Sequence, residues 1–213
     1  MKYISIGRSC QVAYQIRRFF NNNDSYFFDW LITDVNCVDR VLNEFDENKF
    51  LTDIELCADG LRVLDKHTGI QIQHEFKTNS QGIHDVSVLR DELEIKKVKS
   101  KFLYLRNKLL NLLKTSSDEK IVFVWLDWAN QGDFICKRAK SKIEKIISHL
   151  ENNEQIYFLI LSAEVSRDEF FDNGAILRIS SINERTKVSE KWKGDDASWS
   201  RAFNVFSERY NSL

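Results

Sequence analysis

The residue types best suited to chemistry stand near the start of the chain, in the run Gly7-Arg-Ser-Cys10. A strand-like stretch, Tyr3 to Ile6, leads into this run, and a helical pattern of apolar residues follows it. Gly7 allows a tight turn and Ser9 is a candidate N-cap, so Cys10 falls in the first helical turn. The unpaired N–H groups there, the positive end of the helix dipole and the charge of Arg8 all favour a thiolate. We therefore predict a thiol nucleophile at Cys10 with a pKa below that of a free thiol, beside N–H groups that would hold the oxyanion of a tetrahedral intermediate.

The same turn has two other interpretations. Cys10 could simply pack in the core, because free cysteine is among the most buried residue types. The turn could instead hold a phosphate at the helix N-terminus, although its one glycine, Gly7, falls short of the standard nucleotide-binding patterns.

A nucleophilic thiol needs a base, and His74 is the strongest candidate among the four histidines. It alternates with Ile70, Ile72 and Phe76 in a strand-like run. This spacing predicts a partly buried and oriented imidazole, which suits a catalytic base and equally suits a histidine of the core.

A carboxylate would fix the tautomer of that imidazole, and three aspartates are candidates. Asp195 is the first choice, with its neighbour Asp196 and with Asp127, at the end of a buried apolar strand, as alternatives. Asp195 or Asp196 could instead cap the last helix. The residues predicted to contact a substrate precede or follow Cys10, lie in the aromatic stretch 26–32, or end a strand; they are Arg8, Ser9, Gln11, Asp29, Trp30 and Asp127.

The elements that must position these residues alternate between strands and helices. Apolar runs predict buried strands at 121–127, 156–161 and 174–179, and a hairpin is expected between 61 and 76. Helical spacing predicts helices at 35–45, at 86–114 with an interruption near Lys99, at 132–150, and from about 196 to 206. This order indicates one α/β domain over residues 1–213, with three layers and a mostly parallel sheet, Rossmann-like in arrangement. Because ligands of such sheets bind at the carboxyl ends of strands, we expect Cys10, His74 and Asp127 to meet there.

Composition excludes several classes of function. The chain of 213 residues has 31 Lys and Arg against 32 Asp and Glu, so no basic field favours nucleic acid. No apolar run reaches the about 20 residues of a membrane span, and the start of the sequence has no signal-peptide pattern, so we expect a cytoplasmic protein. The four cysteines lack the spacing of a zinc site or a disulfide framework, and we predict no metal and no cofactor.

Three short islands of sequence resemble a bacterial family of papain-like cysteine peptidases of unknown function. They are Ser5 to Arg18, Phe28-Asp-Trp30 and His74-Glu-Phe76, with a further match at Trp192-Lys-Gly-Asp-Asp196 and Trp199. The resemblance implies a thiol nucleophile at Cys10 and a base at His74. Since the predicted sheet is mostly parallel, we expect papain's chemistry without papain's architecture.

Three functions are compatible with these patterns. The first is a thiol-dependent hydrolase or acyltransferase that acts on an ester, thioester or amide of a small molecule, peptide or glycan. The second is a nucleotide-sugar or phosphate-handling transferase, a class that the association of the resembled family with bacterial surface-polysaccharide loci favours. The third is a non-catalytic binding module with an aromatic groove, lined by Phe27, Phe28, Trp30, Trp125 and Trp128.

Overall fold

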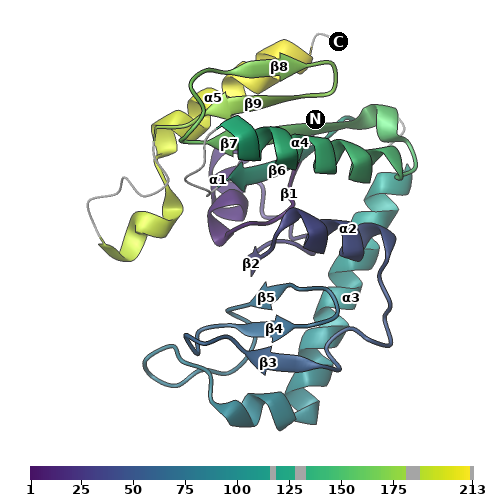
Figure 1. The fold of residues 1–213 in the computed structure, drawn as a ribbon, viewed down its shortest axis with the longest axis vertical. Helices are drawn as coiled ribbons and strands as arrows, with labels where there is room; N and C mark the ends of the chain where they lie inside the picture. Colours follow the sequence, from purple (N-terminus) through teal and green to yellow (C-terminus); the bar gives the residue numbers. More distant parts are fainter. Residues whose placement is uncertain (116–118, 128–132, 181–187, 212–213) are drawn as a thin grey trace.

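Two sheets organise the chain, a mostly parallel one of five strands and an antiparallel one of four (Figure 1). The computed structural model describes residues 1–115, 119–127, 133–180 and 188–211. None of the helices in these ranges is long and apolar enough to cross a membrane.

The first sheet confirms the predicted parallel arrangement. Its strands, in spatial order, are β1 (Lys2–Ser5), β6 (Ile121–Asp127), β7 (Ile156–Ser162), β9 (Gly174–Arg178) and β8 (Glu169–Phe171). The first four run parallel, and only β8, which the sequence analysis missed, is antiparallel to its neighbour. Every residue of β6 is buried, as expected of a strand covered by helices on both faces.

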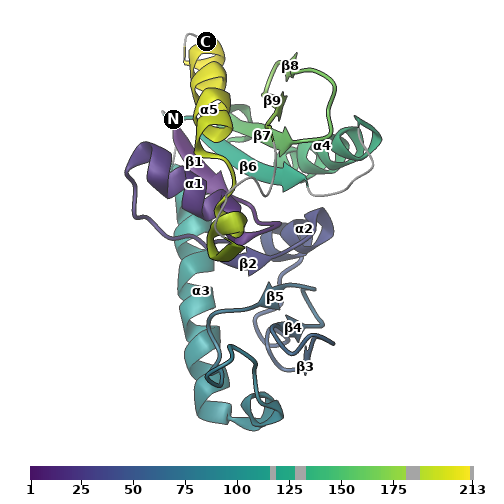
Figure 2. The same cartoon turned by 90° about the vertical axis from the view of Figure 1, so that its left-hand side faces the viewer.

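Helices cover both faces of this sheet and form the three predicted layers (Figure 2). One face carries α1 (Cys10–Phe20) and α5 (Asp196–Tyr210), whose apolar side chains pack on Val122, Val124 and Leu126. The alternate residues of β6, Phe123 and Trp125, pack in the core that contains the other helices. Those helices are α2 (Val35–Asn43), α3 (Glu92–Thr115) and α4 (Asp133–Ser148).

The second sheet is antiparallel throughout and lies beside the first. Its strands, in spatial order, are β2 (Leu31–Ile32), β5 (Gln71–Ile72), β4 (Val63–Asp65) and β3 (Ile54–Leu56). Helix α3 runs from the first sheet down past the second (Figures 1 and 2). The core is continuous between them, because Val63 and Ile72 belong to the same buried cluster as Phe123.

This second sheet confirms one prediction and corrects another. The hairpin expected between 61 and 76 is confirmed, since β4 and β5 pair antiparallel. We also expected His74 to end a strand of the parallel sheet, but β5 ends at Ile72 and belongs to the second sheet, where it pairs with β2 on its other side. The short connection between β4 and β5 favours their antiparallel pairing, because parallel neighbours need a long crossover between them.

The long helix also begins differently from the prediction. A 3₁₀ turn, η1 (Val86–Arg90), precedes α3, and the break falls at Asp91 rather than near Lys99. The side chain of Asp91 accepts a hydrogen bond from the N–H of Glu94, as a helix cap does. Two further 3₁₀ turns are η2 (Asn153–Gln155) and η3 (Val188–Lys193).

Candidate active site

Cys10 is the first residue of α1, at the end of a tight turn that leaves β1. Gly7 and Arg8 turn the chain with φ of +100° and +77°. Ser9 caps the helix, as predicted, and its side chain accepts a hydrogen bond from the N–H of Gln11. The N–H of Cys10 has no carbonyl partner within the helix, since the first turn of a helix leaves its donors unpaired.

Thr33, directly after β2, fixes this turn from the second sheet. Its Oγ1 accepts a hydrogen bond from the N–H of Arg8 at 3.0 Å and donates one to the carbonyl of Ile6 at 3.3 Å. A side chain at position 7 would collide with Thr33, because a Cβ there would lie 1.9 Å from Oγ1. Glycine is therefore required at Gly7 both for its positive φ and for this close approach.

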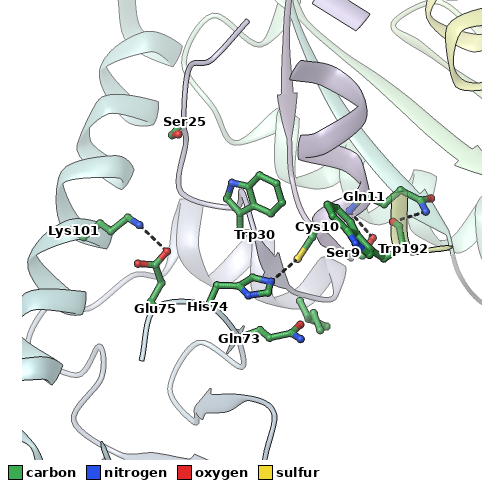
Figure 3. A pocket seen from close by; sticks show the side chains of 11 residues that line it. Ser9, Cys10, Gln11, Ser25, Trp30, Gln73, His74, Glu75, Lys101 and Trp192 are labelled. Atoms are coloured by element: carbon green, nitrogen blue, oxygen red, sulfur yellow. Dashed lines mark hydrogen bonds and ion pairs between the residues drawn. The ribbon is translucent and has the colours of Figure 1, made fainter. Parts of the chain in front are cut away.

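His74 lies within reach of the thiol. Its Nε2 is 3.6 Å from Sγ of Cys10, although the two residues are 64 positions apart (Figure 3). The imidazole is exposed rather than partly buried as predicted, because β5 ends at Ile72 and the alternation stops there.

The Trp30 ring also contacts the imidazole. The two rings meet edge to face, with centroids 6.4 Å apart. The backbone of Trp30 has φ of +64°, which is rare for a bulky residue and requires support from its surroundings. Part of this support is the guanidinium of Arg17, which lies over the Trp30 ring at 5.2 Å.

The electrostatics of Cys10 differ from the prediction. Burial raises the pKa of the Cys10 thiol to about 11, and its own backbone N–H lowers that pKa by less. The predicted pKa below that of a free thiol is therefore wrong. At neutral pH the resting site holds a neutral thiol, so a base must take its proton during any nucleophilic attack.

An open cavity of about 670 Å³ lies in front of these groups, within the range of small-molecule sites. Its apolar walls include Trp30 and Trp192, whose ring centroids are 6.1 Å apart. Lys101 and Glu75 form an ion pair at 2.6 Å, on the opposite side of Cys10 from Trp192 in Figure 3. The lining residues are Ser9, Cys10, Gln11, Ser25, Trp30, Ile32, Gln73, His74, Glu75, Lys101 and Trp192.

The structure brings none of the three candidate aspartates to His74. Asp195 caps α5, where hydrogen bonds from Ser198 and Ser180 lower its pKa although burial acts in the opposite direction. Asp196 pairs with Arg18 at 3.2 Å.

Asp127 lies on the face of the parallel sheet opposite α1, because side chains alternate between the two faces along β6. Cys10 belongs to α1, so Asp127 does not lie beside Cys10. Asp127 accepts a hydrogen bond from the thiol of Cys136 at 3.1 Å. Among the described residues, His74 has no hydrogen-bond partner besides Cys10. The candidate site therefore consists of Cys10 and His74, without any of the predicted aspartates.

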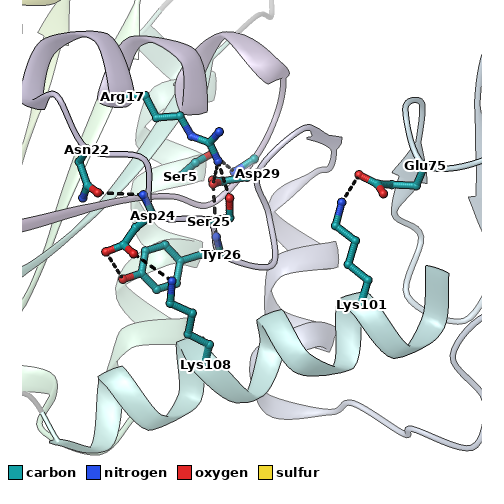
Figure 4. A network of polar contacts seen from close by, with 11 residues as sticks. Ser5, Arg17, Asn22, Asp24, Ser25, Tyr26, Asp29, Glu75, Lys101 and Lys108 are labelled. Atoms are coloured by element: carbon teal, nitrogen blue, oxygen red, sulfur yellow. Dashed lines mark hydrogen bonds and ion pairs between the residues drawn. The ribbon is translucent and has the colours of Figure 1, made fainter. Parts of the chain in front are cut away.

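Of the residues predicted to contact a substrate, only three line the cavity: Ser9, Gln11 and Trp30. Arg8 does not, and its backbone N–H is bound to Thr33. Asp29 is buried against Arg17 at 3.0 Å (Figure 4). Burial raises the pKa of Asp29 to about 6 in spite of this ion pair.

Comparison with protein-family models, with curated proteins and with solved structures finds no significant match for the chain. The resemblance to papain-like peptidases thus stays a prediction. Within the described residues, no group of three His, Cys, Asp or Glu side chains could hold a metal ion.

Several cavity residues were not predicted from the sequence. Lys101 belongs to a run of lysines of the kind that usually marks a solvated helix face, and nothing local distinguishes it. Trp192 belongs to the segment 192–196 that resembles the papain-like family, and this resemblance was the sequence feature that could have indicated its place in the site. Of the residues expected to line an aromatic groove, Trp30 lines the cavity, whereas Phe27, Phe28 and Trp125 are buried in the core. Trp128 lies outside the described residues.

Proposed function

We propose that the protein performs thiol-dependent acyl chemistry, as a hydrolase or an acyltransferase, on an ester, thioester or amide. The observation that carries this proposal is the 3.6 Å separation between Sγ of Cys10 and Nε2 of His74. Both groups line a cavity of about 670 Å³ that admits a small molecule or the end of a longer chain.

The first half-reaction acylates the thiol. His74, with its proton on Nδ1, takes the thiol proton through Nε2 while Sγ attacks the carbonyl carbon. The N–H of Cys10, at the positive end of α1, donates a hydrogen bond to the oxyanion that forms. When the bond to the leaving group breaks, that group takes the proton from His74, and a thioester remains on Cys10.

The second half-reaction releases the acyl group. Water in a hydrolase, or an amine or alcohol in an acyltransferase, attacks the thioester carbon and gives its proton to His74. As the C–S bond breaks, this proton returns to the sulfur and restores the neutral thiol. The acceptor alone distinguishes the two reactions, because both share the same acyl-enzyme.

A phosphate-handling or nucleotide-sugar transferase has less support. The turn that would cradle a phosphate uses the N–H of Arg8 to bind Thr33, and Arg8 does not line the cavity. Acyl chemistry at Cys10 uses the N–H of Cys10 instead, which has no carbonyl partner within the helix.

Acylation by p-nitrophenyl acetate tests the proposal. We expect intact-mass spectrometry to find one acetyl group per chain, mapped to Cys10 and absent in Cys10→Ala. His74→Gln should slow acylation by roughly 10²-fold or more, the usual contribution of a general base. Cys57→Ala and His149→Gln are matched controls outside the cavity and should keep the wild-type rate. Acetylation of the His74→Gln variant at the wild-type rate would refute the proposed role of His74.

A further inference from the structure

Trp192 is an exposed aromatic residue that is nevertheless held firmly in place. Trp192 is 39% exposed. Its carbonyl accepts a hydrogen bond from Nε2 of Gln11 at 2.8 Å, and the next carbonyl, of Lys193, accepts one from Nε2 of Gln15 at 2.6 Å. The Tyr14 ring meets the indole edge to face at 5.3 Å. Together with Trp30, whose ring centroid lies 6.1 Å away, Trp192 forms a contiguous apolar surface in the cavity, and contiguous surfaces of this kind mark ligand-binding grooves.

The cavity beside Trp192 favours an uncharged apolar group. Ile32 and the rings of Trp30 and Trp192 make its apolar walls, and the two indole planes are inclined by 63°. Lys101 and Glu75 supply the positive and the negative charge among the described acidic and basic lining residues, and they pair with each other. Among these described residues, a phosphate or carboxylate on the substrate would find no unpaired lysine or arginine, whereas an alkyl chain or ring would find apolar contact.

We infer that the substrate's acyl group is an apolar chain or ring that packs against Trp30 and Trp192, and that Trp192 determines specificity for it. This inference rests on the proposed acyl chemistry at Cys10. It adds the chemical class of the acyl group, which the Cys10 to His74 geometry alone leaves open.

A series of p-nitrophenyl esters from acetate to octanoate tests the inference. We expect the second-order rate constant for acylation of Cys10 to rise roughly fourfold for each added methylene until the cavity is filled. Trp192→Ala should abolish most of this increase, while Trp192→Phe should retain it. Phe170→Ala removes a comparably exposed ring, 41% exposed on β8, and should leave the series unchanged.

Octanamide binding to Cys10→Ala, followed by tryptophan fluorescence, separates the two proposals. Acylation of Cys10 at rates independent of chain length would overturn the inference and leave the acyl chemistry standing. Failure of every ester to acylate Cys10, with octanamide still binding more tightly than acetamide and losing this preference in Trp192→Ala, would support the apolar site and refute the chemistry. Tighter binding of a methyl glycoside than of octanamide would overturn the apolar assignment.

Discussion

Cys10 experiences two opposing influences on its thiol. The start of α1 favours the thiolate through the helix dipole, whereas burial favours the neutral form. Burial prevails and raises the pKa to about 11. The role that we propose for His74 follows from this balance, because a neutral thiol reacts with a carbonyl only if its proton is removed as the bond forms.

Alkylation by iodoacetamide should report this neutral thiol. Below the pKa the thiolate fraction grows about tenfold for each pH unit, so the alkylation rate of Cys10 should keep rising between pH 7 and pH 10. Quantitative mass spectrometry of the Cys10 peptide measures the rate, with the buried Cys37 and Cys136 as slow internal references. A rate that levels off below pH 8 would indicate a preformed thiolate and imidazolium pair instead.

Asp29 should make the free energy of unfolding depend on pH. Burial raises its pKa in the folded protein to about 6, above the value near 3.9 of an unfolded chain. Between these values the folded state binds more protons than the unfolded state, so the contribution of Asp29 falls as pH rises from 4 to 6. We therefore expect the free energy of unfolding of Asp29→Asn, relative to that of wild type, to rise by roughly 2 to 3 kcal/mol from pH 4 to pH 7. Urea titrations at each pH measure this difference.

Asp24 provides a control of opposite sign. The ammonium of Lys108, which donates to Asp24 at 3.0 Å, holds the pKa of that carboxyl below its usual value. Its stabilising contribution is present above the unfolded pKa and is lost as pH falls, so Asp24→Asn should lose stability relative to wild type as pH rises. Equal pH profiles for the Asp29→Asn and Asp24→Asn variants would contradict the assignment for Asp29.

At the scale of elements, the turn between β1 and α1 decides where Cys10 stands. Gly7 and Arg8 both have positive φ, and Thr33 from the end of β2 occupies the space beside Gly7. Hydrogen bonds of Thr33 thus connect the second sheet to the turn that precedes Cys10.

Gly7→Ala should destabilise the protein by about 3 kcal/mol or more, measured by urea denaturation. The positive φ contributes about 1 to 2 kcal/mol and the collision with Thr33 adds to it. Gly82→Ala is the matched control, since Gly82 has φ of +77° and no heavy atom would lie within 4 Å of its Cβ. Gly82→Ala should lower the free energy of unfolding by only about 1 to 2 kcal/mol, the contribution of the positive φ. If both variants lowered it equally, Thr33 would not constrain the turn.

At the scale of the whole molecule, Cys10 and His74 follow strands of two different sheets, and one core cluster is shared by both sheets. Phe102, on α3, contacts the rings of Phe27 and Phe50 with centroids 5.4 and 6.2 Å away. The same buried cluster contains Phe123 of the parallel sheet and Ile72 of the antiparallel one. Packing of this core therefore sets the distance between Cys10 and His74.

Both sheets should unfold in one cooperative transition. Pulsed hydrogen exchange at increasing urea should expose peptides 54–72 and 121–127 at the same concentration, since the antiparallel sheet and one face of the parallel sheet are buried in the same core. Phe102→Ala should cost about 3 to 5 kcal/mol and shift both transitions together. If peptide 54–72 were exposed at a lower urea concentration than peptide 121–127, the two sheets would not unfold in one cooperative transition.

The sequence by itself determined the local structure around the candidate site. The strand before Gly7, the Ser9 cap and the helix that begins at Cys10 depend on residues within about one turn of one another, so spacing and side-chain type suffice to predict them. The parallel sheet follows for the same reason, because β6 and β7 are continuous apolar runs separated by a helical pattern.

Only the tertiary structure decided which groups meet. Pairing of β5 with β2 and β4 brings His74 beside Cys10 across 64 positions, and alternation along β6 turns Asp127 to the opposite face. Packing of η3 on α1 brings Trp192 to the cavity, and burial raises the thiol pKa against the local helix dipole. These outcomes depend on contacts between distant segments and on desolvation, and neither is encoded in the spacing of neighbouring residues.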